Sequence, residues 1–279
     1  MKNNMFCTMR RAVAIILCLS YVVPTLQINT GASGDFSVSA KAAVVYDPEN
    51  GALLYGKNED NRLPMASTTK IMTALVAIER ESLNKKIKVD PRAVGVEGSS
   101  AYLRECEEFT LRELLYALML ESANDAACAL AIEIGKTVDG FVEMMNEKAK
   151  ALGMNNTTFK NCTGLDAEGH VSTARDIAIM SAALLSHEKI KDYSTVWMDS
   201  LRNGETELTN TNKLVRFYKG CTGLKTGSTD EAGCCLAASA ERGGMELVSV
   251  TLGSPNTDER FAAGRKLLDY GFANFAVAK

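Results

Sequence analysis

Three short motifs contain the residues best suited to chemistry. Ser67-Thr68-Thr69-Lys70 sets a hydroxyl and an amine three positions apart, Ser122-Ala123-Asn124 pairs a hydroxyl with an amide, and Lys225-Thr226-Gly227 joins a cation, a hydroxyl and a bare glycine. On a helix, residues three apart share a face, with β-carbons about 5 to 6 Å apart. A serine hydroxyl is a poor nucleophile until a neighbouring base removes its proton. The first motif therefore predicts nucleophilic catalysis by Ser67 with Lys70 as its base.

Each motif alone is a weak indication. S-x-x-K also occurs at 82–85 and 186–189, and S-x-N recurs at 254–256. Only the copy at 67–70 opens an apolar stretch with helical spacing, whereas the others lie in a charged segment or after a helix end. Without the other motifs, a helix cap followed by a surface lysine is the simpler interpretation, and Asn124 is equally a good N-cap.

The chemistry sets conditions on the surroundings of Lys70. To accept a proton near pH 7, its pKa must fall from about 10.4 by roughly three units, which burial and a second cation can cause. Lys225 is the expected cation. Lysine and threonine in the third motif can bind a carboxylate, while Gly227 leaves room for a substrate backbone beside the chain.

The elements that must position these motifs follow from the local patterns. Short β runs at 42–47 and 52–55 flank Asn50-Gly51, and runs at 235–240 and 247–252 flank Gly243-Gly244, so a hairpin is predicted near each end. Helices are predicted at about 65–81, 110–120, 124–134, 139–152, 173–186 and 258–272, with a capping box at Thr110 and Glu113 and the third motif just before a β run. One sheet built from both ends, with an inserted helical lobe and a cleft between them, is expected.

The three motifs in this order resemble those of penicillin-binding proteins and class A β-lactamases. The likeness is closest to the D-Ala-D-Ala carboxypeptidases, through LPMASTTKIMTAL, LMLESANDAACALA, GLKTGSTDEAG and RKLLDYGFANF, and it runs from about residue 42 to residue 275. It implies an α/β (α+β) fold with an antiparallel five-stranded sheet, flanking helices and an inserted helical lobe.

The resemblance also implies roles. Ser67 would be the acyl-enzyme nucleophile, Lys70 the proton acceptor and Ser122 the proton relay to the leaving D-alanine. Asn124 would bind a substrate amide. The terminal carboxylate would be bound by Lys225, Thr226, Gly227 and Arg260. The N–H groups of Ser67 and Ser228 would form the oxyanion hole. The implied reaction removes D-alanine from peptidoglycan stem peptides ending in D-Ala-D-Ala, with β-lactam antibiotics as inhibitors and without a metal or cofactor.

Three departures from that family pattern stand out. Ala123 replaces the frequent aspartate or glycine, and Ser228 stands where relatives often carry threonine, tyrosine or histidine. The chain stops at Lys279, short of the β-rich domain and amphipathic helix of many relatives. We therefore expect one catalytic domain at 33–279 without a C-terminal β-rich domain.

The first residues have the layout of a signal peptide. Lys2, Arg10 and Arg11 precede an apolar run at 12–23, which is shorter than the roughly twenty residues of a spanning helix. A leader or anchor at 1–32 is predicted, with cleavage after Ala32 or Ala40 equally compatible. The protein is then extracytoplasmic, either secreted or tethered through its leader to the outer face of the bacterial membrane.

Composition argues against several other classes of protein. A formal charge of -3, a pI near 5.6 and the lack of a basic run argue against nucleic-acid binding. The six cysteines outside the leader form no C-x-x-C pair, so neither a zinc site nor a redox motif is indicated. We expect most of them to be buried free thiols, and one or two disulfides are also compatible with the sequence. The two histidines, His170 and His187, are interpreted as a turn residue and a helix end.

Two alternatives use the same cleft. A β-lactamase needs a further general base for deacylation, and no convincing E-x-x-L-N segment lies between Asn155 and Ser172. A non-catalytic sensor of wall peptides or penicillin would bind without turnover, although such proteins usually carry additional membrane or signalling segments. Release of D-alanine separates the enzyme from the sensor.

Overall fold

The structure, a computed structural model, describes residues 27–28 and 36–277. The predicted leader and its cleavage point after Ala32 lie outside the described residues, except for strand β1 (Gln27–Ile28), which pairs with β11 (Phe275–Ala276). Across the described parts of the chain, no helix combines the length and apolar character needed to cross a membrane.

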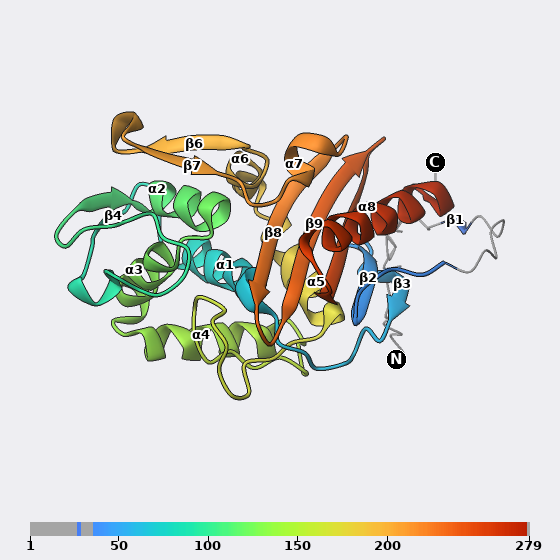
Figure 1. Ribbon diagram of the computed structural model, residues 1–279, viewed down its shortest axis with the longest axis horizontal. Helices are drawn as coiled ribbons and strands as arrows, with labels where there is room; N and C mark the ends of the chain where they lie inside the picture. Colours follow the sequence, from blue (N-terminus) through green and yellow to red (C-terminus); the bar gives the residue numbers. More distant parts are fainter. Residues whose placement is uncertain (1–26, 29–35, 278–279) are drawn as a thin grey trace, which may run out of the picture.

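A five-stranded antiparallel sheet joins the two ends of the chain (Figure 1). The strand order is β3-β2-β10-β9-β8, built from β2 (Ala42–Asp47), β3 (Ala52–Lys57), β8 (Cys221–Thr229), β9 (Gly233–Arg242) and β10 (Met245–Ser254). Both predicted hairpins are confirmed, and the pairing of Val44 with Val250 joins one to the other. The expected fold class is therefore correct.

Both faces of this sheet are covered. Successive side chains of a strand point to opposite faces. Along β2, Ala43 and Val45 accordingly join the apolar cluster under α8 (Thr257–Asn274), whereas Ala42 and Val44 join the larger cluster beneath the helical lobe. On that second face, α5 (Ala174–Leu185) packs against β2 and β10.

The lobe lies between β3 and β8 in the sequence. Its helices and turns are η1 (Ala66–Thr69), α1 (Lys70–Arg80), η2 (Pro91–Ala93), α2 (Leu111–Tyr116), η3 (Ala117–Glu121), α3 (Asn124–Gly135), α4 (Val138–Ala151), α5, η4 (Glu188–Ile190), α6 (Lys191–Ser194), η5 (Arg202–Gly204) and α7 (Leu214–Phe217). Two small two-stranded antiparallel sheets, β4 (Lys86–Lys88) with β5 (Glu108–Thr110) and β6 (Met198–Leu201) with β7 (Thr206–Thr209), complete it and were not predicted.

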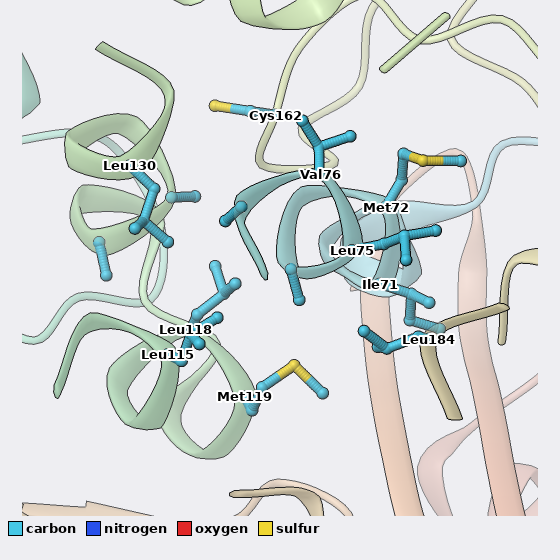
Figure 2. Packing of buried hydrophobic residues seen from close by; sticks show 14 of the residues in the cluster. Ile71, Met72, Leu75, Val76, Leu115, Leu118, Met119, Leu130, Cys162 and Leu184 are labelled. Atoms are coloured by element: carbon cyan, nitrogen blue, oxygen red, sulfur yellow. The ribbon is translucent and has the colours of Figure 1, made fainter. Parts of the chain in front are cut away.

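Helix α1 is the centre of the lobe. Every residue from 70 to 77 is buried, as expected for a helix that neighbours surround on all sides. Figure 2 shows its side chains among those of α2, η3, α3 and α5; the labelled residues are Ile71, Met72, Leu75, Val76, Leu115, Leu118, Met119, Leu130, Cys162 and Leu184. This packing carries Lys70, the first residue of α1, into the interior.

Most predicted helix ends are confirmed. Thr110 and Glu113 form the capping box, the Thr173 side chain caps α5, and Gly153 follows α4 at φ 76°. The prediction of a regular helix through Leu120 is wrong after Tyr116, because the chain widens into a π-helical turn at Ala117–Glu121. Such turns often occur at functional sites.

Candidate active site

Ser67 and Lys70 meet at the start of α1. Ser67 lies in the 3₁₀ turn η1, in which residues three apart are eclipsed, and the Lys70 Nζ to Ser67 Oγ distance is 3.0 Å. Glycine packing keeps this turn in place. A β-carbon on Gly164 would lie 2.1 Å from the Ala66 carbonyl oxygen, and one on Gly227 would lie 2.6 Å from the Ser67 nitrogen.

The Lys70 amine is fully buried, with two further partners. It donates to Asn124 Oδ1 at 2.6 Å and to the Thr163 carbonyl at 2.6 Å. Burial lowers the pKa of Lys70 from its ordinary 10.5 to about 7. A neutral amine has two N–H donors, which these two oxygens accept, so its lone pair is left for the proton of Ser67. The arrangement can therefore activate a serine nucleophile near neutral pH.

The effect of Lys225 on the pKa of Lys70 differs from the expectation. Burial, rather than Lys225, is the main cause of the lowered pKa of Lys70. By contrast, the pKa of Lys225 is lowered well below its ordinary value, first by its own burial and then by the charges of Lys70 and Arg260. Because an opposite charge favours the charged form of an amine, an anionic partner at this position would raise the pKa of Lys225 again.

The second motif follows the π-helical turn. Ser122 is buried and adopts a left-handed backbone at φ 64°, a strained conformation for a residue with a side chain. Among the hydrogen bonds of the described residues, none engages its hydroxyl. Asn124, expected to hold a substrate amide, here uses both ends of its own amide inside the protein, accepting from Lys70 and donating to the Glu97 carbonyl.

The loop at 97–107 contacts Asn124 through the carbonyls of Glu97 and Ser99. Its Ser99 carbonyl accepts from the Asn124 backbone N–H at 2.7 Å. Asp125 fixes this loop by accepting from the Ser100 hydroxyl at 2.6 Å and from the Ala101 and Leu103 N–H groups. The loop is thereby tied to the start of α3.

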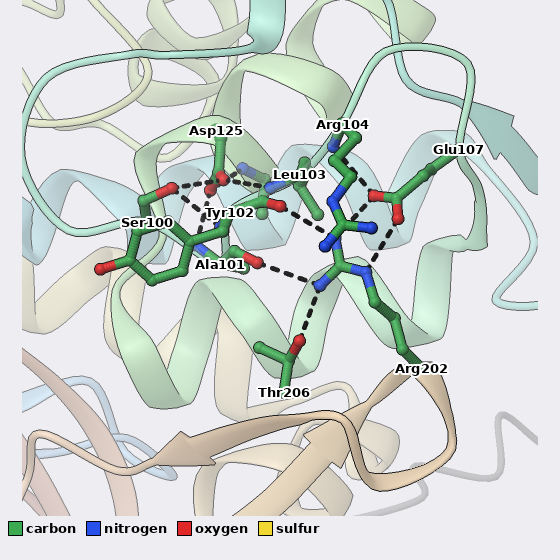
Figure 3. Close-up of polar contacts among 10 residues, drawn as sticks. Ser100, Ala101, Tyr102, Leu103, Arg104, Glu107, Asp125, Arg202 and Thr206 are labelled. Carbon is green, nitrogen blue, oxygen red and sulfur yellow. Dashed lines mark hydrogen bonds and ion pairs between the residues drawn. The ribbon is translucent and has the colours of Figure 1, made fainter.

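The hairpin of β6 and β7 binds the same loop through Arg202. Arg202 pairs with Glu107 at 2.6 Å and donates to the Tyr102 carbonyl at 3.0 Å and to the Thr206 hydroxyl at 2.8 Å (Figure 3). The guanidinium of Arg202 lowers the pKa of Glu107, which keeps the pair charged. These contacts join segments about a hundred positions apart, so no local pattern indicates them.

The predicted β run that follows the third motif is β9, as expected, but the motif itself lies inside β8, a strand that the sequence analysis did not predict. The Thr226 hydroxyl donates to Thr211 Oγ1 at 2.8 Å, and the Thr211 N–H donates to the Leu120 carbonyl at 3.1 Å. Thr211, which the motifs did not reveal, therefore links the strand to the turn that carries Ser122. Lys225 is buried beside Thr226, so the second and third motifs lie at one site.

Arg260 approaches β8 from the first turn of α8. Its Nη1 donates to the Gly227 carbonyl and to the Ser228 hydroxyl, each at 3.1 Å, and burial lowers its pKa. Its Nε is buried without a partner among the described residues. Ser228 itself is exposed.

The segment at 160–170 forms the remaining wall, and sequence reasoning missed its part in the site. It supplies the Thr163 carbonyl to Lys70, and Asn161 Oδ1 braces it by accepting from the Thr163 and Gly164 N–H groups. Asp166 accepts from the Thr229 hydroxyl at 2.6 Å, which ties the segment to β8. A backbone carbonyl leaves no trace in a motif, which explains the omission.

His170 ends a turn, as expected, because its N–H donates to the Ala167 carbonyl at 2.9 Å. It is also buried, and burial lowers its pKa to about 4. Nδ1 accepts from the Lys160 N–H at 2.9 Å, so the ring proton is on Nε2, which lies 2.8 Å from the Thr69 hydroxyl. Thr69 in turn donates to the Ala66 carbonyl. His170 thus braces the turn that carries Ser67.

No group of three or more histidine, cysteine or acidic side chains gathers as a metal site in the part of the chain that the structure describes. The other S-x-x-K copies have exposed serines at Ser82 and Ser186, as expected. Trp197 lies half-buried against Phe217 with Arg216 over its ring.

Comparisons with known proteins agree with this geometry. A family model described as D-alanyl-D-alanine carboxypeptidase matches residues 28–256. The chain is 40% identical over 251 residues to D-alanyl-D-alanine carboxypeptidase DacF of Bacillus subtilis (strain 168), covering 87% of this chain and 64% of that relative. It is 36% identical over 251 residues to D-alanyl-D-alanine carboxypeptidase DacC of Escherichia coli (strain K12), covering 86% of this chain and 62% of that relative.

A solved structure is also similar. Penicillin-Binding Protein D2 from Listeria monocytogenes, in its ampicillin-bound form, superposes with a TM-score of 0.77 at 36% identity, covering 86% of this chain and 100% of that chain. The chain thus spans less than two thirds of the two curated relatives but all of this solved neighbour. The family match over most of the sequence, on a fold that gathers all three motifs at one site, shows that the chain belongs to the D-alanyl-D-alanine carboxypeptidase family, peptidase family S11.

Proposed function

We propose that the protein is a serine-type D-Ala-D-Ala carboxypeptidase that removes the terminal D-alanine from peptidoglycan stem peptides through an acyl-enzyme on Ser67. The observation that carries the proposal is the contact of Ser67 Oγ with a buried amine of Lys70 whose pKa is about 7. Family membership and the names of the relatives support it.

The reaction proceeds in balanced proton steps. Lys70 takes the hydroxyl proton as Ser67 Oγ attacks the carbonyl between the two D-alanines, and the N–H groups of Ser67 and Ser228 donate hydrogen bonds to the developing oxyanion. Ser122 passes the proton from Lys70 to the amine of the departing D-alanine. Water then hydrolyses the serine ester, with Lys70 again as base, and releases the shortened peptide.

Substrate binding is electrostatic at one end. The terminal carboxylate meets Lys225, Thr226 and Arg260 on β8 and α8. Because the pKa of Lys225 is held low by burial and by neighbouring cations, an incoming carboxylate raises it, so the substrate restores the charge that binds it. In the free enzyme Asn124 positions the Lys70 amine. When substrate is bound, the side-chain amide of Asn124 also contacts the substrate amide.

β-Lactams would acylate the same serine. The Listeria relative has been solved with ampicillin bound, and this chain carries Ser67 and Lys70 in its own S-x-x-K motif. We further assign residues 33–279 to a single catalytic domain, and residues 1–32 to an export leader that secretes the protein or tethers it to the outer face of the membrane, where peptidoglycan is remodelled.

Release of D-alanine from diacetyl-Lys-D-Ala-D-Ala tests the proposal. The wild type should release D-alanine, and Ser67→Ala should not. Equal release by both proteins would remove Ser67 from the mechanism. Acylation by penicillin without any D-alanine release would favour a sensor, and rapid penicillin turnover would favour a β-lactamase.

A further inference from the structure

Two cysteines lie behind the Lys70 amine and outside the machinery described above. Cys128 Sγ and Cys162 Sγ are 4.0 Å apart, and both side chains are buried. In Figure 2 the sulfur of Cys162 points away from Val76, toward the side of α3, the helix that carries Leu130. Both thiols are free, and the sequence alone did not indicate which cysteines face each other.

Each cysteine lies close in the chain to one of the two residues, Asn124 and Thr163, whose oxygens accept from the Lys70 amine. Cys128 lies one helical turn after Asn124 on the same side of α3, and Cys162 directly precedes Thr163. The Cys162 carbonyl is also bound by the Thr73 hydroxyl of α1 at 2.7 Å. A bond between the two sulfurs would therefore join the two segments whose oxygens orient the Lys70 amine.

The thiols are also chemically unequal. The hydrogen bond from Cys162 and the nearby Lys70 lower the pKa of Cys128, whereas the pKa of Cys162 is raised by that same hydrogen bond and by burial. Cys128 is also the more accessible thiol, 7% exposed against 0% for Cys162, so peroxide reaches Cys128 first and Cys162 is placed to resolve it.

We propose that Cys128 and Cys162 form a reversible oxidation site whose disulfide slows acylation of Ser67 by displacing Asn124 and Thr163 from Lys70. The effect on acylation rests on the proposed function; formation of the bond does not. The oxidant is a small hydroperoxide such as hydrogen peroxide, which can reach a nearly buried thiol.

The step balances. The Cys128 thiolate attacks one oxygen of the peroxide, the O–O bond breaks, and a sulfenic acid and hydroxide form. The Cys162 sulfur then attacks Cys128 Sγ, the S–O bond breaks, and the two thiol protons end in two molecules of water. The two sulfurs lose two electrons in total, and the peroxide gains them. Closing the S–S distance from 4.0 Å to about 2.05 Å requires α3 and the 160–170 segment to move toward each other.

The test treats the purified full chain with hydrogen peroxide, with and without later dithiothreitol. Mass spectrometry of a non-reduced digest should show a peptide pair linked through Cys128 and Cys162, with loss of two hydrogen atoms. Acylation by a fluorescent penicillin should slow by roughly tenfold or more, since misplacement of a catalytic group by an ångström costs up to about a hundredfold, and dithiothreitol should restore it.

Matched variants separate this pair from the other thiols. Cys106→Ser removes an exposed thiol, and Cys234→Ala removes one 3.6 Å from the Ser228 hydroxyl; both should keep the link and the slowing. Cys128→Ala and Cys162→Ala should each abolish both, and thermal melting identifies either variant if it is unfolded. Cys128→Ser then serves as the second probe.

Two results overturn the inference. One is a peroxide-treated protein with no linked peptide, and the other is complete linkage with an unchanged acylation rate. If the reduced wild type is not acylated at Ser67 at all, the proposed function fails instead, and the linked peptide still reports on the cysteine pair independently.

Discussion

The side-chain oxygen of Asn124 lies 2.6 Å from the amine of Lys70, although the two residues are 54 positions apart and start different helices. This contact occupies one of the two N–H donors of a neutral lysine, and the Thr163 carbonyl occupies the other. The direction of the remaining lone pair toward Ser67 is therefore set by the protein before any substrate arrives. Pre-organisation of this kind lowers the cost of reaching the transition state.

The first prediction concerns pH. Because the base is neutral Lys70 and its pKa is about 7, the rate of Ser67 acylation should fall about tenfold per pH unit below 7 and level off above it. Stopped-flow measurement with a fluorescent penicillin between pH 5.5 and 9 checks this, with Ser67→Ala as the blank. A rate that still climbs steeply above pH 9 would mean that Lys70 is charged in the resting enzyme.

The second prediction uses Asn124→Asp. This change places a carboxylate beside the Lys70 amine, and a carboxylate at that distance raises the pKa of a cation by about 1 to 3 units. The midpoint of the pH profile should move upward, and acylation at pH 7 should slow by roughly tenfold or more. Asn124→Ala is the control: it should slow acylation without moving the midpoint upward. An unmoved midpoint in Asn124→Asp would contradict the contact.

The third prediction compares two glycines in similar backbone conformations. Gly164 at φ 89° abuts the Ala66 carbonyl, whereas Gly153 at φ 76° has open space around it. Gly153→Ala should cost only the conformational strain of about 1 kcal/mol and leave acylation unchanged. Gly164→Ala should displace the Ser67 turn and reduce acylation by a hundredfold or so. Circular dichroism and penicillin labelling measure the two effects, and equal labelling of the two variants would refute the close packing.

The fourth prediction concerns acid stability through His170. The folded-state pKa is about 4 and the ordinary value is 6.5, so between these values the unfolded chain binds a proton that the folded chain does not. Stability should therefore fall as pH drops from 6.5 toward 4, by about 3 kcal/mol from this group. Urea unfolding at pH 7 and pH 4.5 measures the slope.

Variants isolate the contribution of His170 from that of the carboxylates. His170→Gln should be less stable at pH 7, because the contact with Thr69 changes, but its stability should depend less on pH than that of the wild type. His187→Gln, at the other histidine, should keep the wild-type slope. Identical slopes in all three proteins would exclude a buried neutral imidazole at position 170.

Local sequence determined a large share of this molecule. The Asn50-Gly51 and Gly243-Gly244 turns specified both hairpins, and Thr110 with Glu113 specified a helix start. The three-residue spacing of Ser67 and Lys70 specified their contact. All of these depend on groups within a few positions of one another, so turn and helix geometry is enough to predict them.

Tertiary structure alone decided the rest. The strand of Lys225 was missed because Gly223 and Gly227 weaken a β pattern, yet pairing with β9 holds the strand in place and the close approach to Ser67 requires Gly227. The carbonyl of Thr163 reaches Lys70 across 93 positions, and the burial of His170 and Lys70 arises from packing of the whole lobe. A backbone oxygen has no residue type, and burial depends on every neighbour at once. The sequence therefore predicted the contact between a serine hydroxyl and a lysine amine, whereas the folded chain decided how that amine comes to have a lowered pKa.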